Sequence, residues 1–256
     1  MKSKFIAIIS ISTIFMSFSF LKFEKATPRP PGTVKIVENF FFDKTEISNI
    51  DWKEYLSWLK KEFGETSEKY LSATPDRSVW LELAYAEVLA ENYFDHPSYD
   101  GYPVVGISYD QVVQYCEWRT KRVKEMWALN HGSKNVPNFR YRLPTKTEWE
   151  LVANTGFKEL SKKEQRRMKN KPIEQNYNIK QEGGDFFITA PCYSYLPNKH
   201  GMYNLYGNVA EMVSEEGVAK GGSWNHNYNN SVFDAEISYE KPSSWLGFRC
   251  VCEIIE

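Results

Sequence analysis

The chain has 256 residues, a hydrophobic fraction of 42% and a formal net charge of −1, with 32 Lys and Arg against 33 Asp and Glu. The length suffices for one large domain or two small ones, and the apolar fraction is ample for a core. Because no basic excess is available to neutralise phosphates, the composition argues against nucleic-acid binding. The aromatic content of 16% suits a fold in which large side chains fill irregular space between short elements.

The N-terminus has the pattern of an export signal. Lys2 and Lys4 precede an uncharged apolar stretch, residues 5–21. We expect residues 1–23 to be a signal peptide or, since no clear small-residue cleavage site follows, an uncleaved membrane anchor. The proline-rich stretch 24–33 predicts an extended linker, and the folded domain is expected over residues 34–256. The pattern thus predicts an exported protein that is periplasmic, associated with the outer membrane, or secreted.

The first elements after the linker are a predicted strand and a predicted helix. Val34–Phe42 is rich in β-branched and aromatic residues, which favours one strand. Asp51–Phe63 has one apolar face and predicts a helix that is ended by Gly64. Either Asn49 or Asp51 is expected to cap its N-terminus.

Capping boxes mark two further helices. Ser108 with Gln111, and Thr145 with Glu148, have the three-residue spacing in which each side chain can bond the other's backbone N–H. From about Asn176 onward, short aromatic runs alternate with Gly, Asn, Pro and Ser, a texture typical of short strands held by structured loops. The chain as a whole predicts a mixed α+β domain with a large irregular fraction.

The sequence contains four cysteines: Cys116, Cys192, Cys250 and Cys252. An exported chain meets an oxidising compartment, so disulfides are expected. Four cysteines allow three pairings, and their spacing does not choose among them.

The loop Asn204–Glu211 carries hard oxygen ligands at short spacing. The Asn204 amide, the Glu211 carboxylate and the main-chain carbonyls of Gly207 and Val209 are groups that Ca²⁺ prefers. The glycine lets the backbone turn so that its carbonyl can face inward. The alternative is that Asn204 and Glu211 only cap turns.

Six strings, read in order, resemble motifs of the sulfatase-modifying, formylglycine-generating enzyme family, and together they span about Asp43 to Cys252. They are Asp43–Asn49 (DKTEISN), Tyr102–Arg119 (YPVVGISYDQVVQYCEWR), Tyr141–Glu150 (YRLPTKTEWE), Gly201–Glu211 (GMYNLYGNVAE), Lys220–Trp224 (KGGSW) and Leu246–Val251 (LGFRCV). The resemblance implies the fold of that family, a C-type-lectin-like variant with little regular structure. The spacer Glu91–Val105 also resembles the gliding-motility and type IX secretion branch, although the chain lacks that branch's lipidation cysteine.

The resemblance implies two structural calcium sites and one disulfide. The first site is the loop described above. The second would use the side chains of Asn178 and Asp185 with the carbonyls of Ile179 and Phe187. The implied disulfide joins Cys116 to Cys250, which leaves Cys192 and Cys252 either bridged or as buried thiols.

The chemistry of the family depends on residues that this chain lacks. The family oxidises a sulfatase cysteine to formylglycine with copper(I), which is soft and prefers thiolates. His226 and Ser231 stand where the two thiolates are expected, so copper is not expected here, although Ser223, which matches an active-site serine, is retained. Ala210 and Met212 also replace two pocket indoles.

These observations lead to the hypothesis of a non-catalytic family member, exported and stabilised by calcium and a disulfide, that binds a protein partner in the cell envelope. Aromatic loops around residues 193–206 and 224–228 offer contact surface or belong to the core. Two alternatives remain open. One is an active oxidase with a rearranged site, and the other is a calcium-dependent, lectin-like glycan binder.

Overall fold

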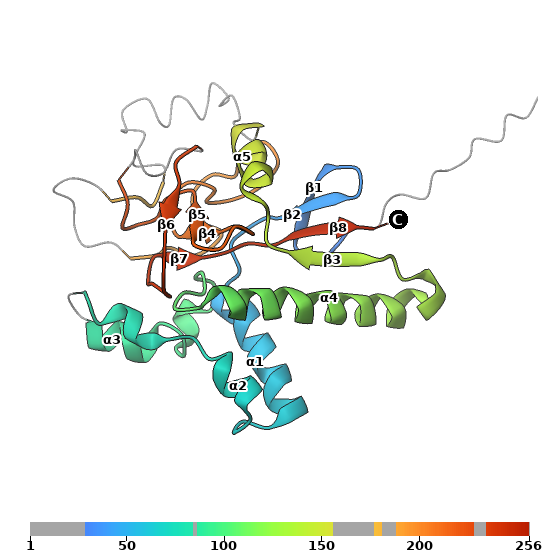
Figure 1. Ribbon diagram of the computed structural model, residues 1–256, viewed down its shortest axis with the longest axis horizontal. Coiled ribbons are helices and arrows are strands. Elements are labelled where there is room, and N and C mark those ends of the chain that lie inside the picture. The colour runs from blue at the N-terminus through green and yellow to red at the C-terminus, as the bar shows by residue number, and fades with distance from the viewer. Residues whose placement is uncertain (1–28, 84–85, 156–176, 181–187, 228–233, 256) are drawn as a thin grey trace, which may run out of the picture.

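The computed structural model describes residues 29–83, 86–155, 177–180, 188–227 and 234–255 (Figure 1). The predicted signal or anchor segment, 1–23, lies outside the described residues, as does the linker up to residue 28. None of the described helices is both long enough and apolar enough to cross a membrane.

A four-stranded antiparallel sheet contains the N- and C-terminal strands of the domain. Its strand order is β1 (Thr33–Val37), β2 (Phe40–Asp43), β8 (Val251–Ile254) and β3 (Phe139–Arg142). The prediction of one strand over Val34–Phe42 is wrong, because the chain reverses at Glu38–Asn39 to form the β1–β2 hairpin. Asn39 has φ of 59°, a left-handed conformation that asparagine tolerates in turns.

The second sheet is built from shorter strands. Its order is β6 (Ile237–Ser238), β5 (Val218–Lys220), β4 (Ala210–Met212) and β7 (Leu246–Gly247), and only the β4–β7 pair is parallel. These strands of two or three residues confirm the predicted change of texture in the C-terminal part.

The three longest described helices begin at side-chain caps. They are α1 (Asn49–Phe63), α4 (Tyr109–His131) and α5 (Lys146–Thr155); the shorter helices are α2 (Glu68–Ser72), α3 (Ala86–Asn92) and the 3₁₀ turns Arg77–Trp80, Pro97–Tyr99 and Ser133–Asn135. Ser108 with Gln111, and Thr145 with Glu148, form the expected reciprocal caps. For α1 the expected cap is wrong. Ser48 is the N-cap, and Asp51 completes its capping box.

Successive side chains along β2 and β8 point to opposite faces of the first sheet, and helices pack against both faces. Phe41 and Cys252 face a core that also contains residues of α1 and α4, whereas Phe42 and Val251 face a second core against Trp149 of α5. Figure 1 shows α4 running along one side of this sheet and α5 lying on the other.

A third buried cluster connects the loops that carry the predicted sites. Val209, from the loop before β4, packs with Trp224, from the loop after β5, and with Trp80 and Tyr93. Trp224 is therefore core rather than contact surface. The cluster holds the loops around residues 204–211 and 221–226 against each other.

Candidate functional site

The loop after β5 brings Ser223 and His226 into contact. The Ser223 hydroxyl oxygen lies 2.6 Å from His226 Nδ1 and also accepts a hydrogen bond from the Asn225 backbone N–H. Ser223 is fully buried, and the His226 ring packs edge-on against Trp245. Burial, and to a smaller extent the nearby Lys180, lowers the pKa of His226 to about 4. The imidazole is therefore neutral at pH 7.

This loop does not fit copper(I). The imidazole of His226 is intermediate between a hard and a soft ligand, and it is already hydrogen-bonded to Ser223. None of the four cysteines lies within residues 221–234. Ser231 falls outside the described residues. Ala210 and Met212 are fully buried in β4, where they pack in the core. Within the described ranges, no group of three or more His, Cys, Asp and Glu side chains is placed to hold a metal.

The first predicted calcium loop is held in an unusual backbone conformation. Asn204 and Gly207 have φ of 50° and 78°. A Cβ at Gly207 would lie 2.6 Å from the carbonyl oxygen of Asn178, so only glycine fits this close approach. Val209 and Glu211 follow, and both are fully buried. The structure thus gathers all four predicted residues in one buried turn that leads into β4.

Glu211 accepts hydrogen bonds from two side chains. Arg249 donates from Nε to Oε2 (2.7 Å) and from Nη2 to Oε1 (2.5 Å), and the Trp149 indole donates to Oε2 (2.7 Å). Both partners of the ion pair are fully buried. Arg249 also donates to the carbonyl oxygen of Tyr203. The predicted metal ligand is therefore also the counter-ion of a core arginine.

Glu46 is a member of this site that the sequence analysis missed. It lies between β2 and α1, is fully buried, and accepts hydrogen bonds from the side-chain amides of Asn208 (2.8 Å) and Asn204 (3.3 Å). Burial raises the pKa of Glu46 to about 7, an effect that Arg249 opposes and Glu211 reinforces. The available signal is its place in the string Asp43–Asn49, the first of the six strings that resemble the family.

These residues fit a cation of the calcium type. In the part of the chain that the structure describes, the buried carboxylates Glu46 and Glu211 share a single guanidinium, Arg249. The neighbouring Arg119 is occupied by Asp43, to which it donates two hydrogen bonds. Glu46, whose pKa is raised to about 7, is thus left without a counter-charge of its own among amide and carbonyl oxygens, and hard oxygen donors that include carboxylates are what Ca²⁺ selects.

The second predicted calcium site is only partly described. Asn178 and Ile179 are buried, whereas Asp185 and Phe187 lie outside the described residues. The side-chain amide of Asn178 donates hydrogen bonds to the main-chain carbonyl of Ile188 and to Asn208 Oδ1. The main-chain carbonyl of Asn178 accepts a hydrogen bond from the Asn208 backbone N–H. The two predicted loops therefore touch, with Asn208 between them.

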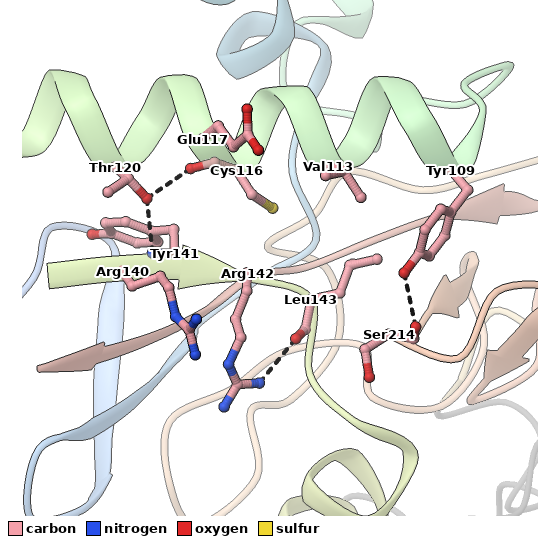
Figure 2. A pocket seen from close by; sticks show the side chains of 10 residues that line it. All are labelled: Tyr109, Val113, Cys116, Glu117, Thr120, Arg140, Tyr141, Arg142, Leu143 and Ser214. Carbon is pink, nitrogen blue, oxygen red and sulfur yellow. Dashed lines mark hydrogen bonds between the residues drawn. The ribbon is translucent and has the colours of Figure 1, made fainter. Parts of the chain in front are cut away.

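The predicted disulfide partners meet in the core. Cys116 of α4 and Cys250, just before β8, have their sulfur atoms 3.6 Å apart as thiols. Cys252 belongs to the same core cluster, whereas Cys192 lies elsewhere. Figure 2 shows the Cys116 thiol at a cavity of about 430 Å³ between α4 and β3, where Tyr109 donates a hydrogen bond to the Ser214 carbonyl.

The domain has two small sheets in which most strand pairs are antiparallel, capped helices on both faces of the first sheet, and loops rich in oxygen ligands. Together these features define an α+β domain of the formylglycine-generating-enzyme type. The chain belongs to the family described as the sulfatase-modifying factor enzyme 1-like domain, whose model matches residues 13–254. This match confirms the family resemblance that the six strings predicted.

Three curated relatives illustrate the range of this family's sequence. The chain is 28% identical to mouse formylglycine-generating enzyme over 87% of its own length and 68% of that protein. It is 26% identical to the serine/threonine-protein kinase pkn1 of Chlamydia pneumoniae over 83% of its length, which is 26% of the kinase. It is also 28% identical to bovine inactive C-alpha-formylglycine-generating enzyme 2, over 58% of the chain and 50% of that protein.

Among solved structures, CarF superposes with a TM-score of 0.55 at 18% sequence identity, over 85% of this chain and 87% of CarF. At this identity the likeness shows the fold alone, and it confirms the predicted α+β formylglycine-generating-enzyme fold.

Proposed function

We propose that the chain is a non-catalytic member of its family, exported to the cell envelope, where it acts as a structural or binding component of an assembly of the gliding-motility or type IX secretion kind. The observation that carries the proposal is the absence of cysteine from residues 221–234, where the resemblance places the family's two thiolates and this sequence has His226 and Ser231. The imidazole of His226 is neutral and hydrogen-bonded to Ser223, so its packing requires no metal. The bovine relative described as inactive is a precedent for family members without the activity.

Calcium is proposed as a structural ion that ties the buried loops together. Support comes from the buried charge excess of Glu46 and Glu211 beside Asn204. An ion at this position joins the segment before α1 to the loop before β4, two regions that are far apart in sequence. We expect removal of calcium to lower the thermal midpoint without changing the fold, since the Glu211–Arg249 pair remains.

The proposed partner surface is an exposed aromatic loop. Tyr193, Tyr195 and Leu196 are 65%, 41% and 57% exposed, and Tyr195 has φ of 65°. Exposed tyrosines at a strained turn offer large contact area with little side-chain entropy to lose on binding. This loop borders a cavity of about 700 Å³, whose lining includes Ile50 and Tyr193. We take this face as the contact surface for an envelope protein.

The oxidase alternative is tested directly with copper and a substrate peptide. Purified protein is titrated with copper(I) against a competing chelator and incubated with a Cys-x-Pro-x-Arg peptide, followed by mass spectrometry. We expect neither tight copper binding nor the mass change of cysteine to formylglycine. The double variant His226→Cys with Ser231→Cys serves as a matched control that restores the thiolate pair and should gain copper affinity. Peptide conversion by the unmodified chain would overturn the proposal.

The partner surface is tested by photo-crosslinking in membranes. A benzophenone side chain at Tyr195 is compared with one at Leu71, which is exposed on α2 and does not line the cavity beside this loop. We expect one discrete protein adduct from position 195 and none from position 71. Adducts from neither position, together with chelator-sensitive binding on a glycan array, would favour the lectin-like alternative instead.

A further inference from the structure

Basic and aromatic side chains alternate across one face that α1, α2 and α4 share. The Lys69 ammonium lies 4.1 Å from the centre of the Phe63 ring, and this ring packs edge-on against Trp58 with 5.8 Å between ring centres. Two cations of α4 lie over Trp58, Lys121 Nζ at 5.8 Å from the ring centre and the Arg122 guanidinium carbon at 5.9 Å. We call these five residues the basic–aromatic face.

Exposed apolar side chains continue this face towards the end of α4. Arg122, Met126 and Leu129 are spaced by four and three residues, so they lie on one side of the helix. Met126 is 41% exposed, and Leu129, at 87%, is the most exposed large apolar side chain that the structure describes. Apolar side chains beside lysine and arginine on one helix face are typical of helices that lie in the headgroup layer of a membrane.

The charge of this part of α4 is positive. Residues 119–134 contain five lysines and arginines and a single acidic residue, Glu125, which forms an ion pair with Arg122. In the described ranges, Lys69 and Lys121 lie over aromatic rings and have no acidic partner. Their ammonium groups are therefore available to an anionic surface, which attracts basic residues that lie within a Debye length of it.

The chain enters the domain beside the same helix. The main-chain carbonyl of Pro31 accepts a hydrogen bond from the Arg119 guanidinium of α4, at 3.3 Å. Residues 22–30 connect this point to the apolar stretch 5–21, and a fully extended chain of that length spans at most roughly 30 Å. Insertion of the apolar stretch in a bilayer would therefore keep this side of α4 close to the lipid headgroups.

We propose that the basic–aromatic face rests on an anionic membrane surface, with Leu129 inserted among the lipid headgroups. Aromatic rings suit the boundary between lipid and water, and the long lysine side chains allow their ammonium groups to reach lipid phosphates. An acidic protein would use the same ammonium groups, but it would not account for the attachment of the apolar stretch beside this face. The inference rests on the proposed export to the cell envelope and adds the orientation of the domain on the membrane.

The test is photo-crosslinking of the full chain on vesicles of phosphatidylglycerol and phosphatidylcholine. A benzophenone side chain replaces Leu129 or, as the matched control, Leu151, which is 57% exposed on α5, on the opposite side of the first sheet from α4 (Figure 1). Vesicle binding is measured in parallel by flotation, so that lipid adducts are counted by mass spectrometry per bound molecule. We expect at least about fivefold more lipid adduct at position 129 than at position 151. Equal yields at the two positions overturn the inference.

Removal of charge tests the electrostatic part of the contact. Lys69→Gln combined with Lys121→Gln should lower the lipid adduct at position 129 at least about fivefold, because two charges leave the face. Lys35→Gln combined with Lys241→Gln is the matched control, since these exposed lysines pair with glutamates outside the face, and it should leave the yield unchanged. An equal loss in both double variants would mean that no particular face meets the lipid, and it would overturn the inference.

Three further results separate this inference from the proposal on which it rests. A protein adduct at position 195 in membranes, with no lipid adduct at position 129, refutes the membrane face and leaves the envelope role intact. Recovery of the chain from the cytosol refutes export, whereas lipid adducts at position 129 on vesicles would still support the face. Protein adducts in place of lipid adducts at position 129 in native membranes would assign the face to an acidic partner and overturn the inference.

Discussion

The sulfur atoms of Cys116 and Cys250 lie 3.6 Å apart in the core, close enough for a bond to form with a small movement of either side chain. Because 134 residues separate them, a bond between them would close a long loop and restrict the unfolded chain strongly. The cavity at Cys116 gives an oxidant or a small thiol a route to this pair.

We therefore expect oxidised protein to contain two free thiols fewer than reduced protein. Cys116→Ser should lower the free energy of unfolding by about 2–5 kcal/mol under oxidising conditions, measured with urea. Cys192→Ser is the control; because it replaces a buried thiol outside the core cluster of the pair, its effect on stability should be the same under oxidising and reducing conditions. Four titratable thiols in protein isolated from the periplasm would show that the pair stays reduced.

The His226 imidazole should make stability depend on pH over a defined window. Its pKa is lowered to about 4 in the folded chain, against a usual value of about 6.5 when unfolded. Between these values the unfolded chain binds a proton that the folded chain does not. This contribution to the free energy of unfolding is therefore fully present above pH 6.5 and is lost as the pH falls towards 4.

Proton NMR of the His226 ring checks this directly. The resonance should remain constant from pH 8 to about pH 5, because the pKa of the ring is lowered to about 4. His226→Gln should flatten the loss of thermal stability below pH 6.5. A His226 midpoint near 6.5 would mean that the ring is not held neutral by its surroundings.

Breaking the Glu211–Arg249 pair should be among the most damaging single changes to the domain. Arg249→Met leaves Glu211 buried beside Glu46 without a counter-ion, so we expect the free energy of unfolding to fall by about 3–5 kcal/mol. Arg140→Met is the comparison, since its ion pair with Glu253 is largely exposed and should contribute at most about 1 kcal/mol. Equal effects in urea unfolding would contradict the assigned burial.

Gly207 should tolerate no side chain, for a reason that does not apply to Gly64. Gly207→Ala combines a left-handed φ with a methyl group 2.6 Å from the Asn178 carbonyl oxygen. Gly64→Ala has a similar φ but meets nothing within 4 Å, so it should cost only the backbone strain, about 1–3 kcal/mol. We expect Gly207→Ala to cost clearly more in urea unfolding and to weaken calcium binding, whereas similar costs would indicate that the loop simply relaxes.

Elements marked by local chemistry were predictable from the sequence. The capping boxes at Ser108 and Thr145 depend on residues three positions apart, and both are formed. The β1–β2 hairpin was missed because Glu38–Asn39 is a weak turn signal within a run of strand-forming residues. Glu46 was missed for a different reason. Its partners Asn204 and Asn208 are about 160 residues away, and no periodicity reports a contact between such distant segments.

The position of β8 has a consequence for how the chain becomes native. This strand is formed by the last residues of the domain, yet it lies between β2 and β3 and pairs with both. The first sheet therefore cannot be completed until residues 251–254 are available to pair with both neighbours. Because β2 and β8 come from opposite ends of the domain, their pairing is a non-local contact of the kind that slows folding.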